Sequence, residues 1–144
     1  MRNLLLLFSF LLIYPCTSLQ AQDEVWRTLF KVGYDKVVDK DLGYEVMYPI
    51  FPEEVMALNG KEITITGYII PLEDDIGYFA FSAFPYENCF FCGNAGMETV
   101  MEVYAKKPLK YSPKAITIRG KLKINEEDIV SHLMYILEDA VLVN

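Results

Sequence analysis

Two segments of the chain repeat one strand pattern, and glycine interrupts both at the same place. The pattern Ile-Thr-Ile-x-Gly-x-[Ile/Leu] occurs at residues 63–69 and again at residues 116–122. Isoleucine alternates with threonine before the first glycine, which is the period-two pattern of a strand with one buried face. A glycine inside a strand indicates a bulge or tight bend, because only a residue without a Cβ lets the chain coil sharply there. The chain is therefore expected to contain two strongly bent strands.

Five segments carry strand patterns, and together they indicate the fold. The first begins at Lys61, and the others cover residues 78–84, 99–104, 115–124 and 133–143. An acidic turn around residues 73–77 joins the first two. Two bent strands among five, with little helix, are what a small closed barrel of the OB type requires. We therefore predict a mainly β protein whose residues 61–144 form a five-stranded OB-like barrel, with a β-sandwich as the alternative.

An N-terminal arm with a short helix is expected over residues 22–60. Three apolar residues predict that the arm lies on the domain, namely Trp26, Leu29 and Val32. The run at 43–48 has a strand pattern that ends before Pro49 and Pro52. Residues 52–60 are predicted to form one or two helical turns, since proline is favoured at the first helical position and Asn59-Gly60 is favoured at the end of a helix.

The first 21 residues have the pattern of a secretory signal peptide. Arg2 is a minimal basic region, and residues 4–14 form an apolar segment too short to span a bilayer. Small residues place the expected cleavage after Ala21. Cys16 offers lipidation as the less favoured alternative, because Tyr14-Pro15 fits a lipoprotein signal poorly. We expect an exported protein, in the periplasm, with no transmembrane span after cleavage.

The remaining part has the composition of one acidic globular domain. The whole chain is 53% hydrophobic and 23% charged, which disfavours a disordered tail. Loss of Arg2 with the leader takes the formal net charge from −7 to −8. Nucleic acid binding needs clustered basic residues, and only Lys106-Lys107 and the pair Lys121 and Lys123 approach this. Nucleic acid is therefore not an expected partner.

A series of short motifs resembles a known family. The motifs follow one another in the order Trp26-x-x-Leu29, Leu58-Asn59-Gly60-Lys61, Gly67-Tyr68-Ile69-Ile70-Pro71-Leu72-Glu73 and Pro85-Tyr86-x-x-Cys89. The series resembles an uncharacterised bacterial family of exported proteins, a domain of unknown function. The match spans nearly the whole chain after the leader. The resemblance implies an OB-type barrel and, because some members are associated with transporter systems for metal homeostasis, an envelope or transporter protein as partner.

The chain departs from this family around its two later cysteines. Many relatives carry a single cysteine, a nearby histidine and a proline run ending in Asn-Gln. Here the sequence Cys89-Phe90-Phe91-Cys92-Gly93 stands instead. Cysteine and histidine replace each other chiefly as metal ligands, so the departure is compatible with a metal site.

The Cys-x-x-Cys-Gly turn predicts a site for zinc or copper(I). In such a turn Cys89 and Cys92 direct two thiolates at one ion, and the glycine permits the tight turn. A structural zinc ion has four ligands, so a site within the chain needs further ligands. The candidates are His132, Met97 and Glu98, of which the methionine suits copper(I). A second turn from a partner chain would also complete the site, in a homodimer.

Two other functions of the cysteine pair remain open. Exported proteins meet an oxidising environment, where paired cysteines usually form a disulfide, here Cys89–Cys92. A thiol-disulfide oxidoreductase is the third hypothesis, although the Gly93-Asn94-Ala95-Gly96 run that follows does not favour the helix that activates such thiols. Three flanking aromatic residues are candidate partner or ligand contacts, namely Tyr86, Phe90 and Phe91. No catalytic residue is identified, and we expect a binding protein and not an enzyme.

Overall fold

The computed structural model describes residues 18–38, 40, 43–72, 78–129 and 131–143. Most of the expected signal peptide, including Cys16, lies outside the described residues, as do the acidic turn at residues 73–77 and Glu73 of the family motif. In the described part of the chain, no helix is long and apolar enough to cross a membrane.

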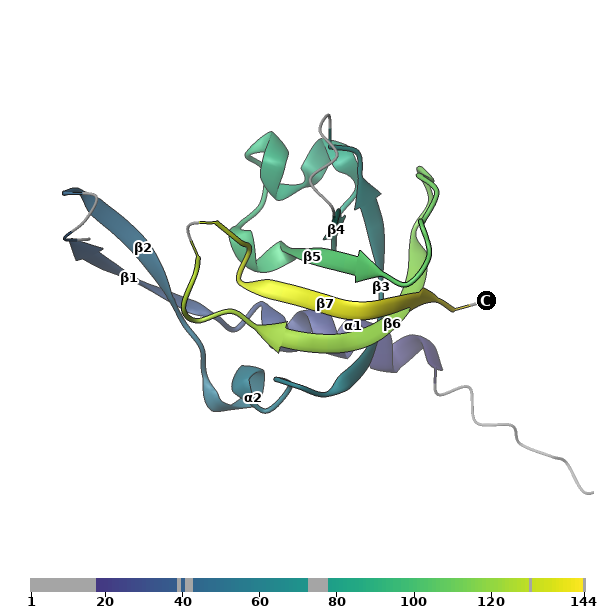
Figure 1. Ribbon diagram of the computed structural model, residues 1–144, viewed down its shortest axis with the longest axis horizontal. Coiled ribbons are helices and arrows are strands. Elements are labelled where there is room, and N and C mark those ends of the chain that lie inside the picture. Colours follow the sequence, from purple (N-terminus) through teal and green to yellow (C-terminus); the bar gives the residue numbers. More distant parts are fainter. Residues whose placement is uncertain (1–17, 39, 41–42, 73–77, 130, 144) are drawn as a thin grey trace, which may run out of the picture.

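Five strands close into a barrel, as the sequence predicts (Figure 1). The strands are β3 (Glu62–Ile70), β4 (Phe79–Ser82), β5 (Val100–Ala105), β6 (Ile116–Ile124) and β7 (Tyr135–Leu142). Their order around the barrel is β3-β4-β5-β7-β6, with β6 pairing with β3 to close the ring. Strands β5 and β7 run parallel, and every other pair in the barrel is antiparallel. The mainly β, OB-like prediction is confirmed.

The two repeated glycines lie where the strands bend. Strand β3 pairs with β6 up to Gly67 and with β4 from Tyr68 onward, so Gly67 marks the change of partner. The β6–β7 register shifts between Arg119 and Lys121, which places Gly120 at a bulge. A Cβ at position 120 would lie 2.7 Å from the carbonyl oxygen of Glu138. Both glycines therefore serve the close approach of two strands, as their place in the strand pattern indicates.

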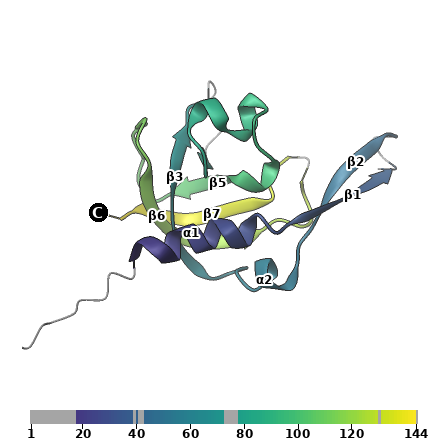
Figure 2. The same cartoon turned by 180° about the vertical axis from the view of Figure 1, so that it is seen from behind.

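The N-terminal segment begins with a helix. Helix α1 (Ser18–Leu29) covers one side of the barrel (Figure 2). Trp26, Leu29 and Val32 are buried in the main core, and the indole N–H of Trp26 donates to the carbonyl of Thr66 at 2.8 Å. The prediction that these residues lie on the domain is confirmed. The helix was not predicted, because Trp26 and Leu29 alone cover too little sequence to establish a helical period.

A two-stranded hairpin projects from the barrel (Figures 1 and 2). Its strands are β1 (Gly33–Val38) and β2 (Glu45–Ile50), which pair antiparallel with each other. The predicted strand at 43–48 is β2, but the strand continues through Pro49, which an edge strand tolerates. Strand β1 was not predicted. Helix α2 (Glu53–Met56) follows, with Pro52 as its N-cap residue, and Gly60 ends this segment at a positive φ of 75°.

A second, smaller cluster of apolar residues lies apart from the main core. Ala80 and Val100 belong to it, whereas Phe81 and Met101 belong to the main core, because successive strand residues face opposite sides. We call this second group the outer cluster, and it consists of Ile70, Ala80, Cys89 and Val100 with Tyr68, Leu72, Phe90 and Leu133 packed against them. The connection between β4 and β5 thus folds Cys89 and Phe90 over the outer face of β3, β4 and β5.

Candidate functional site

Two short 3₁₀ turns hold the cysteine pair, and we call residues 86–94 the dithiol turn. The first turn covers Tyr86–Asn88 and the second covers Phe90–Cys92. Cys89 is fully buried, Cys92 is exposed, and both are free thiols. Their Sγ atoms lie 3.9 Å apart. The sequence spacing therefore does bring the two thiols together.

Backbone and side-chain hydrogen bonds fix the dithiol turn. The N–H of Cys92 donates to the carbonyl of Cys89 at 3.2 Å. Gly93 has the left-handed φ of 76° that closes the second 3₁₀ turn, a conformation that glycine adopts without strain. The side-chain amide of Asn94 donates to the carbonyl of Glu87 at 2.8 Å, which ties the end of the turn to its beginning. These hydrogen bonds fix the conformation of the dithiol turn.

The surroundings of Cys92 favour its protonated thiol. Loss of hydration, the hydrogen bond to Cys89 and the nearby charges of Cys89 and Glu87 raise the pKa of Cys92. A side-chain hydrogen bond with Tyr86 acts in the opposite direction on this pKa. The S–H of Cys92 also donates to the backbone carbonyl of Tyr86 at 3.0 Å. A nucleophilic thiol of an oxidoreductase needs a lowered pKa. The raised pKa of Cys92 therefore gives no support to the oxidoreductase hypothesis.

The structure does not bring the other predicted ligands into the same arrangement. His132 lies in the connection between β6 and β7, where Nδ1 is 3.1 Å from a carboxylate oxygen of Glu102. Glu98 accepts a hydrogen bond of 2.6 Å from the hydroxyl of Tyr34. Met97 packs against the main core, and Cys89 belongs to the outer cluster. Among the described residues, no three His, Cys, Asp or Glu side chains are grouped closely enough to hold one metal ion.

The three predicted aromatic contacts divide between surface and interior. Tyr86, three residues before Cys89, is 49% exposed, and Phe91, between the two cysteines, is 45% exposed. Phe90 instead packs against the outer cluster, and its ring meets that of Phe91 edge to face at 5.4 Å. Two of the three side chains are thus available for contact with a partner.

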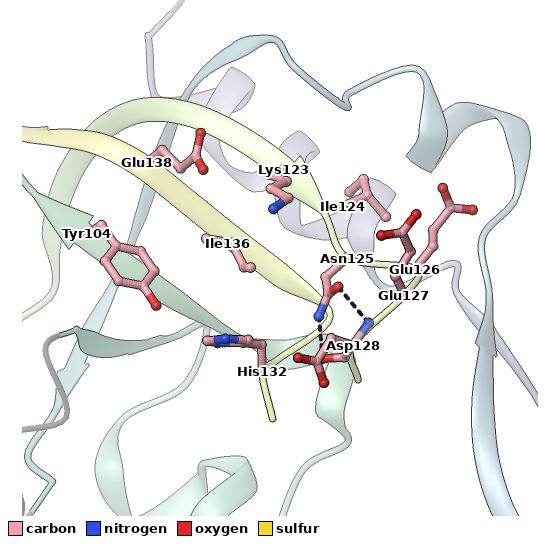
Figure 3. Close-up of a pocket in the computed structure, with 10 residues that line it drawn as sticks. All are labelled: Tyr104, Lys123, Ile124, Asn125, Glu126, Glu127, Asp128, His132, Ile136 and Glu138. Carbon is pink, nitrogen blue, oxygen red and sulfur yellow. Dashed lines mark hydrogen bonds between the residues drawn. The ribbon is translucent and has the colours of Figure 1, made fainter. Parts of the chain in front are cut away.

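A second arrangement of polar residues escaped the sequence analysis. A hollow of about 490 Å³ lies beside the β6–β7 connection (Figure 3). Its lining residues are Tyr104, Lys123, Ile124, Asn125, Glu126, Glu127, Asp128, His132, Ile136 and Glu138. We call it the His132 hollow. Next to it, Glu102 of β5 is fully buried and hydrogen-bonded to His132. Nothing in the local pattern of Val100–Ala105 distinguishes a buried glutamate from one facing solvent.

Comparisons with known proteins give a limited result. No family model matches the chain, and no curated protein matches it. A crystal structure of a DUF3299 family protein from Pseudomonas aeruginosa PAO1 is similar, with 18% sequence identity and a TM-score of 0.44. The match covers 61% of this chain and 64% of that one, so this chain spans less than two thirds of the similar protein. That protein belongs to a family of unknown function, and the likeness carries no argument about the activity of this chain.

Proposed function

We propose that this protein is an exported binding protein, not an enzyme, that binds a soft metal ion, zinc or copper(I), through the thiolates of Cys89 and Cys92. The observation that carries the proposal is the distance of 3.9 Å between the two Sγ atoms. Thiolates are the ligands that both ions prefer, and a Cys-x-x-Cys turn is their usual form.

The sulfur separation suits an ion placed between the two atoms. With a Zn–S bond of about 2.3 Å, two sulfurs at this separation subtend an angle of about 116° at the ion. A tetrahedral site has an angle of about 109°, so the pair supplies two corners of the tetrahedron with little movement. Copper(I) binds to the same soft donors. The geometry is thus compatible with either ion.

Completion of a four-ligand zinc site within this chain would require rearrangement. His132 would have to leave Glu102, or Glu98 would have to leave the hydroxyl of Tyr34. A ligand from a partner protein, or from a second copy of this chain, avoids both losses. The exposed Cys92 is the sulfur that such a partner would reach first.

Metal content and free thiols measured on one sample test the proposal. The protein is purified from its exported compartment without chelator or reductant. We expect near-stoichiometric zinc or copper, with thiols that resist alkylation until a chelator removes the metal. Failure of the reduced protein to bind zinc or copper(I) tightly would contradict the proposal.

Variants separate the thiols from the other predicted ligands. Cys92→Ser changes an exposed residue, and Cys89→Ala avoids placing a hydroxyl in the apolar outer cluster. Both should lose metal. Met97→Leu, Glu98→Gln and His132→Asn should keep it if the ligands come from outside the chain, and the variant that loses metal identifies an internal ligand.

A disulfide-stabilised, partner-binding accessory of an envelope or transporter system is the second candidate. Exposed Tyr86 and Phe91 favour it, since aromatic residues are enriched at the centres of protein interfaces. Oxidation would shorten the sulfur separation from 3.9 Å to about 2.05 Å. In this case the purified protein carries no metal, and its thiols react only after reduction. Tyr86→Ser and Phe91→Ser would then weaken partner binding while the barrel stays folded.

A thiol-disulfide oxidoreductase is the third candidate and receives the least support. The pKa of Cys92 is raised by loss of hydration and by its neighbours, and each 3₁₀ turn of the dithiol turn is only three residues long. One cysteine reacting far faster than the other near neutral pH would favour this activity.

The exported location and the family remain part of the proposal. The signal pattern in residues 1–21 supports export to the periplasm, and the series of motifs supports membership of an exported bacterial family. Mass spectrometry of the mature N-terminus tests the location. A chain beginning at Gln22 is expected, and a lipid on Cys16 would establish anchoring instead.

A further inference from the structure

The basic residues of this acidic chain are concentrated in one stretch of sequence. Residues 103–125 hold seven of the 13 basic residues and none of the 20 acidic ones, so the rest of the chain has a formal charge of −14. Four of the seven lie in the connection between β5 and β6, and they are Lys106, Lys107, Lys110 and Lys114. A separation of charge this strong indicates a protein that meets an anionic partner through one surface.

The connection between β5 and β6 lies at one end of the barrel, and apolar residues of β7 lie at the same end. Strands β5 and β7 run parallel, so both finish at this end. The N–H of Lys106 donates to the carbonyl of Ala140 at 3.0 Å, which ties the connection to β7. We call residues 106–115 together with Leu142 and Val143 the lysine-rich end, which lies beside the label C in Figure 1.

The lysine-rich end exposes apolar side chains among its charges. Tyr111 is 57% exposed, Leu142 is 49% exposed and Val143 is 39% exposed. A hollow of about 450 Å³ between the connection and β7 is lined mostly by apolar residues. The aliphatic side chains of Leu142 and Val143 have no flat face on which a nucleic-acid base could stack. They fit instead among the acyl chains at a membrane surface, where tyrosine is also enriched.

The lysines at this end are available to an anionic surface. Lys107, Lys110 and Lys114 are exposed, and none of them forms an ion pair with a residue that the structure describes. The Nζ atom of Lys106 is 3.9 Å from a carboxylate oxygen of Asp139, and both side chains are largely exposed, so this pair is weak. Acidic residues elsewhere on the molecule oppose binding little, because charges more than about 8 Å apart are largely screened at physiological salt.

Helix α1 begins toward the same end of the molecule. In Figures 1 and 2 its first turn lies on the side that carries the label C. Cys16 precedes Ser18, the first residue of α1, by two positions. An uncleaved leader or a lipid on Cys16 would therefore hold this end of the barrel, and not the opposite one, at a membrane. The dithiol turn precedes β5 and so lies toward the other end of that strand.

We propose that the lysine-rich end binds the surface of a membrane that contains anionic phospholipids. The ammonium groups of the three unpaired lysines contact lipid phosphates, while the stems of these side chains lie against apolar surface. Tyr111, Leu142 and Val143 enter the boundary between headgroups and acyl chains. The surface is separate from the cysteine pair and does not depend on metal binding there.

Co-sedimentation with vesicles tests the proposal. The exported protein is mixed with vesicles of phosphatidylcholine and with vesicles of phosphatidylcholine and phosphatidylglycerol in equal parts. At about 0.15 M salt we expect binding to the mixed vesicles only, and at about 1 M salt, where the screening length is about 3 Å, this binding should fall by about tenfold or more. Equal binding to both kinds of vesicle, or binding to neither, would overturn the proposal.

Two triple variants with the same change in net charge locate the surface. The first replaces the unpaired lysines of the lysine-rich end and is Lys107→Gln, Lys110→Gln and Lys114→Gln. The second replaces exposed lysines elsewhere and is Lys36→Gln, Lys40→Gln and Lys61→Gln. Each lysine near an anionic surface strengthens binding about fivefold, so the first variant should bind roughly a hundredfold more weakly and the second nearly as well as the unchanged protein. Equal losses in the two variants would contradict the proposal.

A pair of tyrosine variants separates a membrane from an anionic polymer. Tyr111→Ser should weaken binding to the mixed vesicles about fivefold, because apolar area is no longer buried in lipid. Tyr44→Ser is the matched control, since Tyr44 is 60% exposed and lies outside the lysine-rich end. A single-stranded oligonucleotide and polyglutamate are added as competitors. If either releases the protein from the mixed vesicles and the two tyrosine variants bind alike, the partner is an anionic polymer and the proposal fails.

Discussion

Substitution of Gly67 by alanine should destabilise the barrel where β3 changes its partner strand. A Cβ there would lie 2.9 Å from Cε1 of Phe81 and closer still to the carbonyl oxygen of Ser82. Neither neighbour moves easily. Phe81 is fully buried in the main core, and β4, which carries Ser82, pairs with strands on both sides. Overpacking of this kind costs about 1–3 kcal/mol.

A smaller opposing effect comes from the unfolded chain. Alanine restricts the unfolded state more than glycine does and returns about 0.4–1 kcal/mol of stability. The expected net loss for Gly67→Ala is therefore about 1–2 kcal/mol. Gly33→Ala is the matched control, since Gly33 also lies in a strand and its nearest neighbours, atoms of Ile50, are 3.9 Å from an added Cβ. The control should be neutral or slightly stabilising.

Urea unfolding followed by tryptophan fluorescence measures both variants. The chain has one tryptophan, Trp26, whose indole N–H binds the carbonyl of Thr66 beside Gly67, so the probe reports on the altered region. With a slope of roughly 1–3 kcal/mol per molar urea, the midpoint of Gly67→Ala should fall by about 0.3–2 M at unchanged slope. If Gly67→Ala unfolds at the same midpoint as Gly33→Ala, the role assigned to this glycine is wrong.

Three further predictions follow from titrating and buried groups. Burial and the charge of Glu98 raise the pKa of Tyr135, so above pH 10 the unfolded tyrosine loses its proton while the folded one keeps it. Stability should therefore fall as pH rises from 10, by up to about 1.4 kcal/mol per pH unit, and Tyr135→Phe should reduce this slope in urea titrations. Because its neighbours raise the pKa of Cys92, the metal affinity should fall about tenfold, from the protonation of this thiol alone, for each pH unit below that pKa. Competition with a metal indicator at several pH values measures this affinity, and an affinity independent of pH would contradict the prediction. Glu102→Gln replaces two charged acceptors by one neutral acceptor and should cost about 1–3 kcal/mol in thermal unfolding, whereas Glu138→Gln, at a half-buried residue that lines the His132 hollow, should cost little.

The barrel could be predicted because each of its strands is recognisable from residues that are adjacent in the sequence. Period-two alternation identifies each strand from a few neighbouring residues, and the two glycines mark the bends. Helix α1 and strand β1 were missed for a different reason. In α1 the apolar residues Trp26 and Leu29 cover too little sequence to establish a helical period, and their burial depends on contact with β3, which is distant in the sequence. The exposed pattern of β1 gives no alternation at all.

In the candidate sites, too, contacts between residues close in the sequence could be predicted, and contacts between distant residues could not. Cys89 and Cys92 lie three residues apart, so their spacing alone predicts that the sulfurs approach each other. The partners of the other predicted ligands could not be predicted. Glu102 and His132 are 30 residues apart, and Tyr34 and Glu98 are 64 apart. Each pair forms only because the tertiary fold places its two segments together, and no motif in one segment specifies the other.

The dithiol turn and the His132 hollow share one structural element, Leu133. Its N–H donates to Glu102, which holds His132, and its side chain packs against the outer cluster that contains Cys89. A displacement of the β6–β7 connection would therefore disturb the packing around the buried thiol, and a change at Cys89 would reach the carboxylate that holds the histidine. Conservative variants such as His132→Asn and Cys92→Ser leave Leu133 in place. They can separate the chemistry of each site from its support, whereas substitution of Glu102 or Cys89 affects both.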